Sequence, residues 1–166
     1  MSTSPSQPET FEYEQYAPPE GSSDPSAGSD ETRSYDSLGI QARSLDELIR
    51  LLKENGLPIR SFDRLQEALG ISATTLADTI SIAMRTLRRR RKTGHFKTDE
   101  SERLLRLARL FERASEVLGS PERARTWMKE PLPVLGGQSP LDYADTEPGA
   151  REVERVLGRI AHGVFS

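Results

Sequence analysis

From about residue 41 onward, apolar positions recur at intervals of three and four residues, the spacing of one face of an α-helix. The longest such stretches lie in residues 98–119 and 146–164. No run of four to eight residues alternates between apolar and polar positions, as a half-buried strand would. The pattern therefore predicts an all-α fold of several helices joined by short turns.

Capping residues and glycines divide this region into separate helices. A Ser or Thr hydroxyl before an apolar stretch can accept a hydrogen bond from a free backbone N–H, and a Gly after it can adopt the left-handed conformation of a helix end. The expected starts are Ser44, Ser61, Ser72, about Met84, Thr98, Ser120, Ser139 and Thr146. Residues 129–137 are rich in Pro and Gly, so we expect a loop there.

The first forty residues differ in composition from the rest. They contain five prolines and nine serines and no helical or strand repeat, so we expect a disordered tail over residues 1–40. Phe11, Tyr13 and Tyr16 form an aromatic cluster among acidic residues. Three interpretations stay open for this tail, namely a solvated segment, a short binding motif, and an acidic segment that shields basic residues elsewhere in the chain.

Charge is unevenly distributed along the 166 residues, although the formal net charge is only −3. Residues 1–40 hold eight acidic and one basic residue, residues 41–99 seven and twelve, and residues 100–166 eleven and ten. The basic excess therefore lies in the middle of the chain, and the low net charge does not exclude nucleic-acid binding.

Composition excludes several classes of site. The chain has no cysteine and two histidines, which excludes disulfides and thiolate metal sites, and we expect neither a metal nor a cofactor. No apolar stretch approaches the roughly 18 residues of a membrane span, and the N-terminus lacks the features of a secretory signal. We therefore expect a cytoplasmic protein without a membrane partner. Motifs for phosphate loops, dinucleotide folds and zinc hydrolases are absent, so we expect no enzyme.

Residues 76–91 have the spacing of a helix-turn-helix, with Leu76, Ile80, Ile82 and Leu87 as inward contacts. In a major groove, the first turn of the second helix faces the bases, and arginine can hold O6 and N7 of guanine together. We expect Met84, Arg85 and Arg89 to face bases, and Arg88, Arg90, Arg91 and Lys92 to meet phosphates. A solvated cationic face, or a site for an acidic partner such as the chain's own tail, remains an alternative.

The order of motifs over residues 42–164 resembles the Xre/MbcA/ParS-type antitoxins that pair with RES-domain toxins in bacterial type II toxin-antitoxin operons. Residues 82–96 correspond to the family pattern I-S-R-R-T-L-A-R-R-K-x-x-G-R-L, and residues 98–104 to the start of its long helix. Its C-terminal signature is matched by Trp127, Pro131, Leu135–Gly137, Ser139–Leu141 and then Gly149, Val153, Leu157, Arg159, Ile160 and Gly163.

Three departures from the family pattern bear on DNA binding. Ser81 replaces a Gly at the turn, where positive φ is favoured, and Ala83 replaces the Ser that caps the second helix. Met84 replaces a more polar residue at a position that faces the bases.

The resemblance implies a helix-turn-helix domain over residues 41–98 and a helical toxin-binding domain over residues 99–166. It implies an antitoxin that binds a RES-domain, NAD-degrading toxin, blocks its active site, and represses its own operon by binding operator DNA. We expect a homodimer, because paired half-sites about one helical turn apart need two readers. A stand-alone helix-turn-helix regulator without a toxin is the alternative, and an inhibitor that binds toxin but not DNA is a third possibility. The expected toxin-binding residues are Gly136, Gly137, Pro140, Leu141, Arg151, Arg155, Arg159, Val164 and Phe165.

Some of these residues have a second interpretation. Gly136 and Gly137 equally fit a tight turn, and the three arginines could face either solvent or an acidic rim. We expect Trp127, Val153, Leu157 and Ile160 to be core residues, because their helical spacing already explains them.

Overall fold

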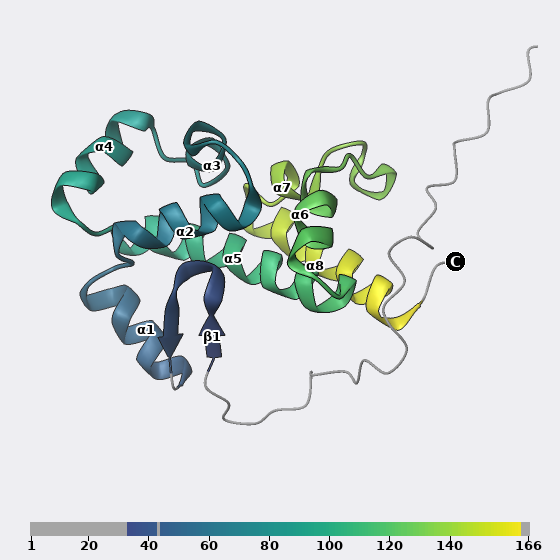
Figure 1. Ribbon diagram of the computed structural model, residues 1–166, viewed down its shortest axis with the longest axis horizontal. Coiled ribbons are helices and arrows are strands. Elements are labelled where there is room, and N and C mark those ends of the chain that lie inside the picture. Colours follow the sequence, from purple (N-terminus) through teal and green to yellow (C-terminus); the bar gives the residue numbers. More distant parts are fainter. Residues whose placement is uncertain (1–32, 43, 164–166) are drawn as a thin grey trace, which may run out of the picture.

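The computed structural model describes residues 33–42 and 44–163, and this part of the chain is mostly helical, as the apolar pattern predicts. A short hairpin comes first and eight α-helices follow within the described residues (Figure 1). The elements are β1 (Arg33–Tyr35), the 3-10 helix η2 (Asp36–Leu38), β2 (Ile40–Ala42), α1 (Leu45–Glu54), α2 (Ile59–Leu69), α3 (Ala73–Thr79), α4 (Met84–Thr93), α5 (Thr98–Leu118), α6 (Pro121–Lys129), the 3-10 helix η3 (Pro133–Leu135), α7 (Pro140–Tyr143) and α8 (Glu147–His162).

The hairpin corrects one expectation, since residues 33–40 of the predicted tail form β1, η2 and the start of β2. These short strands are a small addition to a fold that is otherwise helical. β1 and β2 pair antiparallel, with Tyr35 opposite Ile40. Tyr35, Leu38 and Ile40 are buried, and η2 packs against α2 and α5. Strands of three residues are too short to show alternation, and their burial depends on helices far along the chain. Residues 1–32 of the predicted tail lie outside the described residues.

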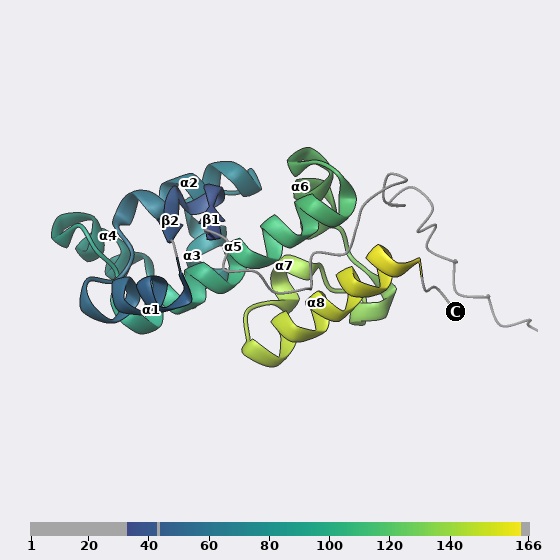
Figure 2. The ribbon, with the colours of Figure 1, turned by 90° about the horizontal axis from the view of Figure 1, so that it is seen from below.

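α5 is the central element of the fold. Helices α1 and α2 and the hairpin contact it, and so do α6 and α8 (Figures 1 and 2). The N-terminal part of α8 reaches the middle of α5, where Arg106 contacts Glu147. Its inward side chains are fully or nearly fully buried and include Leu104, Leu107, Ala108, Leu110, Phe111, Ala114 and Leu118. One continuous 21-residue helix therefore joins the region of the helix-turn-helix to the C-terminal helices.

Most of the predicted helix ends are confirmed. The side chains of Ser44, Ser72, Ser120, Ser139 and Thr146 each accept a hydrogen bond from the backbone N–H three residues later. Ser61 is an exception, because it is buried inside α2, which begins after Pro58. At α5 the cap is Lys97, whose backbone N–H donates to the Glu100 carboxylate at 2.8 Å.

The loop of residues 129–137 is more regular than its composition predicts. It contains η3, and Leu132 pairs with Gln138 across its base. Within the described part of the chain, no helix is long and apolar enough to cross a membrane.

Candidate functional site

Helices α3 and α4 form the predicted helix-turn-helix. Its expected inward contacts Leu76, Ile80, Ile82 and Leu87 are all buried. In the turn, Ser81 has φ +54°. It is the single non-glycine residue with positive φ among the residues described. This is the conformation that a Gly would adopt without a steric cost.

The first turn of α4 has no side-chain cap. Ala83 stands at the N-cap in an extended conformation and accepts no hydrogen bond through its side chain. The free N–H groups of this turn therefore face solvent or a ligand, and an anion is favoured there by the helix dipole.

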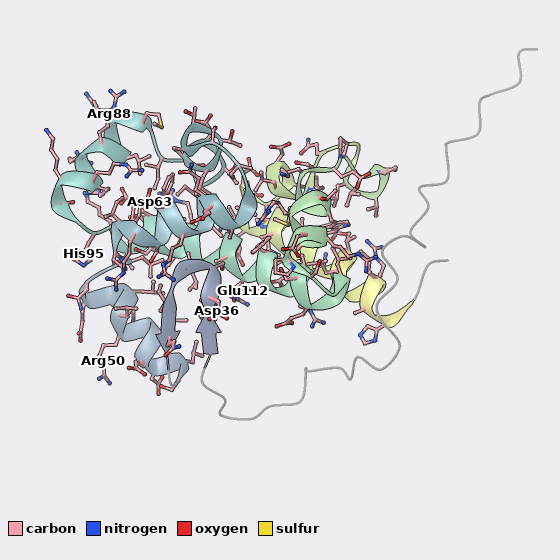
Figure 3. The ribbon with its side chains drawn as sticks, in the orientation of Figure 1. Asp36, Arg50, Asp63, Arg88, His95 and Glu112 are labelled. Carbon is pink, nitrogen blue, oxygen red and sulfur yellow. The ribbon has the colours of Figure 1, made fainter. Side chains whose placement is uncertain are left out.

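α4 presents a cationic surface to solvent. Arg85, Arg88, Arg89 and Lys92 are exposed, and none of them has an ion-pair partner within the described residues. Arg88 points away from the body of the protein (Figure 3). Met84 is half-buried and packs partly against the core, so the rest of its side chain is available to a ligand. We call Arg85, Arg88, Arg89 and Lys92 the α4 cationic surface.

Arg90 does not belong to this surface, which corrects the expectation that it meets a phosphate. It is 7% exposed and forms a two-pronged ion pair with Glu100, Nε to Oε2 at 2.7 Å and Nη2 to Oε1 at 2.9 Å. The physical reason is helical spacing, because Arg90 follows the buried Leu87 by three residues and so shares its inward face.

The Glu100 carboxylate stays ionised inside the protein. Burial by itself would raise its pKa, but the hydrogen bonds from Arg90 and from the Lys97 backbone, with the charges of Arg90 and Arg103, hold that pKa below the usual value. The same hydrogen bond to Glu100 raises the pKa of Arg90. The pair therefore joins α4 to α5 as a charged contact, and it fixes the orientation of α4.

Arg91 is exposed as expected, but it already has a partner. Its Nη2 atom lies 2.7 Å from Oδ1 of Asp63 on α2, and each of these side chains is about half exposed. A phosphate at Arg91 would therefore compete with Asp63. No local pattern singles out Asp63 as a partner, because it lies 28 residues away from Arg91.

Apart from the three arginines of α8, the predicted toxin-binding residues fall into three groups. Gly136 and Gly137 are exposed with φ +67° and +81°, and an added Cβ would meet nothing within 4 Å at either position, which favours the tight-turn interpretation. Pro140 and Leu141 are buried, so we correct their assignment: α7 packs against α6 and α8, and these two side chains hold it there. Val164 and Phe165 lie outside the described residues.

The three arginines of α8 form an exposed stripe with acidic neighbours. Arg151 contacts Glu147 at 3.2 Å, and Arg155 and Arg159 contact the same Glu152 at 2.8 Å and 3.6 Å. Hydrogen bonds from Arg151 and from Arg106 of α5 lower the pKa of the Glu147 carboxyl. The expected core residues of this region, Trp127, Val153, Leu157 and Ile160, are all buried.

One feature of this region carries no signal in the sequence. A groove of about 490 Å³ lies between α5 and α8, where Arg106 and Arg109 face Glu147 and Glu154. It brings together segments about forty residues apart, which no local pattern can indicate. No group of three or more potential metal-ligating side chains occurs within residues 33–42 and 44–163.

Comparison with known proteins places these two regions in one family. Residues 47–109 match the antitoxin Xre-like helix-turn-helix domain, and residues 113–163 match the antitoxin Xre/MbcA/ParS C-terminal toxin-binding domain. The first match therefore ends, and the second begins, within α5. Neither domain is a catalytic one.

Curated relatives agree with both matches. The chain is 34% identical over 131 residues to proteins named antitoxin Xre from Photorhabdus laumondii and Yersinia enterocolitica, which covers 78% of this chain and 88% of each relative. It is 30% identical over 123 residues to the Prs ADP-ribosylating antitoxin of a Sphingobium species, which covers 68% of this chain and 77% of the relative. The chain therefore belongs to the Xre antitoxin family, with an Xre-like helix-turn-helix followed by a C-terminal toxin-binding domain of the Xre/MbcA/ParS type.

Proposed function

We propose that this protein is the antitoxin of a type II operon, that it neutralises a RES-domain, NAD-degrading toxin by covering its active site, and that it represses its own operon. The observation that carries the proposal is the pairing, on one chain, of an unpartnered α4 cationic surface with residues that match a toxin-binding domain. The sequence resemblance supplies the RES partner. The name of the Sphingobium relative also links an antitoxin to ADP-ribosylation, a reaction that uses NAD as its donor.

The DNA half of the proposal rests on α4. In a major groove, Met84 and Arg85 in its first turn would face base edges, and Arg89 would follow one turn later. Arg88 and Lys92 would neutralise phosphates, and each such contact would steepen the salt dependence of binding by about one unit. Since paired half-sites about one helical turn apart need two readers, the repressor would act as a homodimer.

The toxin half of the proposal rests on the C-terminal helices. An antitoxin that blocks a substrate pocket needs shape and charge but no reactive group. The exposed arginine stripe of α8 and the turn at Gly136 and Gly137 offer such a surface, since they do not contribute to the buried core.

Co-expression with the adjacent open reading frame tests the proposal. We expect the neighbour to stop growth alone and to be harmless in the presence of this chain. A neighbour that is harmless alone, or that remains toxic beside this chain, would favour a stand-alone regulator instead. A band-shift on the upstream DNA at low and high salt separates the third possibility, because an inhibitor that binds only toxin would give no shift even at low salt.

A further inference from the structure

Helix α8 contains a glycine that its own fold does not require. A glycine within a helix lowers stability relative to alanine, because the unfolded backbone has more freedom to lose. Gly149 is explained by the fold, since an added Cβ would collide with the carbonyl oxygen of Tyr143. Gly163 is explained by its φ of +62° at the helix end. Gly158 has neither reason, because it lies inside α8 and an added Cβ would meet nothing within 4 Å.

Gly158 lies in a shallow depression on the surface of α8. The depression has a volume of about 470 Å³, and it is lined by Glu152, Arg155, Gly158, Arg159 and His162. The missing side chain leaves the helix backbone open at this point, so another chain can approach more closely here than at any alanine. We call this depression the Gly158 notch.

The Gly158 notch has an excess of positive charge. Arg155 and Arg159 both contact the single carboxylate of Glu152, and their side chains remain 73% and 45% exposed. Two guanidinium groups therefore share one negative charge, and each keeps N–H donors that face solvent. Guanidinium groups of this kind bind carboxylates well, because the planar fork of N–H groups matches the two oxygens.

We propose that the Gly158 notch is a contact point for the toxin, and that it receives a toxin segment whose backbone packs against α8 and whose carboxylate meets Arg155 and Arg159. The inference rests on the proposed function, and it specifies the face of the protein and the chemistry of the partner. Three observations support it. The notch lies within the segment that matches a toxin-binding domain, it has an excess of positive charge, and it contains a glycine for which the fold of this chain gives no reason.

Two substitutions at Gly158 separate toxin binding from folding, because they should raise the stability of the free protein and lower its affinity for the toxin. Gly158→Ala and Gly158→Leu should each raise the Tm of the unbound protein by about 2–4 °C, since both residues favour a helix. Gly158→Leu should weaken binding to the purified product of the adjacent gene at least tenfold, and Gly158→Ala should weaken it less. Glu67→Leu, which adds a leucine on an exposed part of α2, is the matched control and should leave the affinity unchanged.

Arg155→Gln tests the charge of the notch. It should weaken toxin binding several-fold at low salt and reduce the salt dependence of the affinity, because it removes one of the two guanidinium groups. An unchanged affinity and an unchanged salt dependence would contradict the expected carboxylate contact.

The outcomes distinguish this inference from the proposed function. If the unmodified chain binds the toxin and Gly158→Leu binds equally well, the notch is not a contact point, while the antitoxin function stands. If the unmodified chain does not bind the product of the adjacent gene, the proposed function itself fails. If Gly158→Leu changes the oligomeric state of the free protein and leaves toxin affinity unchanged, the notch meets a second copy instead, which also overturns the inference.

Discussion

Arg90 and Glu100 form a buried ion pair that links the helix with the α4 cationic surface to the long helix α5. Both hydrogen bonds of the pair are 2.9 Å or shorter, and Glu100 accepts a further bond from the Lys97 backbone. The run of basic residues in α4 thus has two tasks, since Arg90 holds the helix in place and its neighbours remain available to a ligand.

Removing Arg90 should therefore reduce stability, while removing Arg88 should not. Arg90→Ala leaves the Glu100 carboxylate buried without its partner, and we expect a loss of about 3–5 kcal/mol in the free energy of unfolding. Arg88→Ala changes an exposed side chain and should shift it by less than about 0.5 kcal/mol while weakening DNA binding. Urea unfolding and a band-shift on both variants check this, and equal stability losses would contradict the assignment.

Acid should weaken the pair at Glu100. Its pKa in the folded protein lies below the ordinary 4.5, so the stability that it contributes is complete above 4.5 and is lost as the pH falls through the folded value. Urea unfolding between neutral pH and pH 3 should show this loss in the unmodified chain. In Glu100→Gln the corresponding part of the pH dependence should be missing, and an unchanged profile would contradict the charged state of the pair.

Glu112 should show the opposite pH dependence. It lies on α5 beside the hairpin, where its Oε1 atom accepts hydrogen bonds from Ser37 N–H at 3.1 Å and Ser37 O–H at 2.6 Å. Burial first, and then the negative charges of the neighbouring Asp36 and of Glu116, raise its pKa (Figure 3). Its ionisation therefore costs stability as the pH rises through the folded pKa, and that cost is absent below the ordinary 4.5.

The variant Glu112→Gln tests this sign. The amide oxygen can still accept both hydrogen bonds from Ser37, and the burial of a charge is removed. We expect a higher free energy of unfolding at pH 7 than in the unmodified chain, with a difference that disappears below about pH 4.5. A lower stability at pH 7 would show that the charge itself holds the hairpin on α5.

The turn of the helix-turn-helix should tolerate a residue with more conformational freedom. Ser81→Gly relieves a positive φ that costs a non-glycine residue about 1 kcal/mol, so it should raise the free energy of unfolding by up to that amount. Ala83→Ser should add a capping hydrogen bond worth about 1 kcal/mol at the start of α4. Thermal unfolding measures both, with Ser72→Ala as the control that should lose a cap of similar value.

The acidic N-terminal segment should oppose DNA binding. Residues 1–32 hold seven acidic residues and no basic one, whereas α4 exposes unpaired cations. Deletion of residues 1–32 should strengthen DNA binding several-fold at low salt, because repulsion and competition for α4 are removed. A variant with these acidic residues changed to Gln and Asn should behave like the deletion. If the neutral variant behaves like the full chain, charge is not the cause.

The sequence was most informative where the determinants of structure are local. A hydroxyl and a backbone N–H three residues later suffice to place the starts of α1, α3, α6 and α8. The hairpin could not be predicted, because its burial depends on α2 and on Glu112, which is 75 residues from its partner Ser37. Ser61 looked like a cap, but the chain enters α2 earlier, at Pro58.

In the candidate site, too, local determinants could be predicted and long-range contacts could not. The exposure of Arg85, Arg88 and Arg89 follows from helical spacing. The inward position of Arg90 follows from it too, but a buried arginine is acceptable only once Glu100 is known to lie opposite it. The burial of Leu141 depends on how α7 packs against α6 and α8, which no pattern within this short helix reveals.

The proposed function requires that this chain neutralises its partner by blocking an NAD-consuming reaction. The most direct test measures the loss of NAD in the presence of the purified product of the adjacent gene, with increasing amounts of this chain. We predict that the neighbour alone consumes NAD and that consumption stops once the complex is saturated. Continued consumption of NAD in the saturated complex, or no consumption by the neighbour alone, would contradict the proposed function.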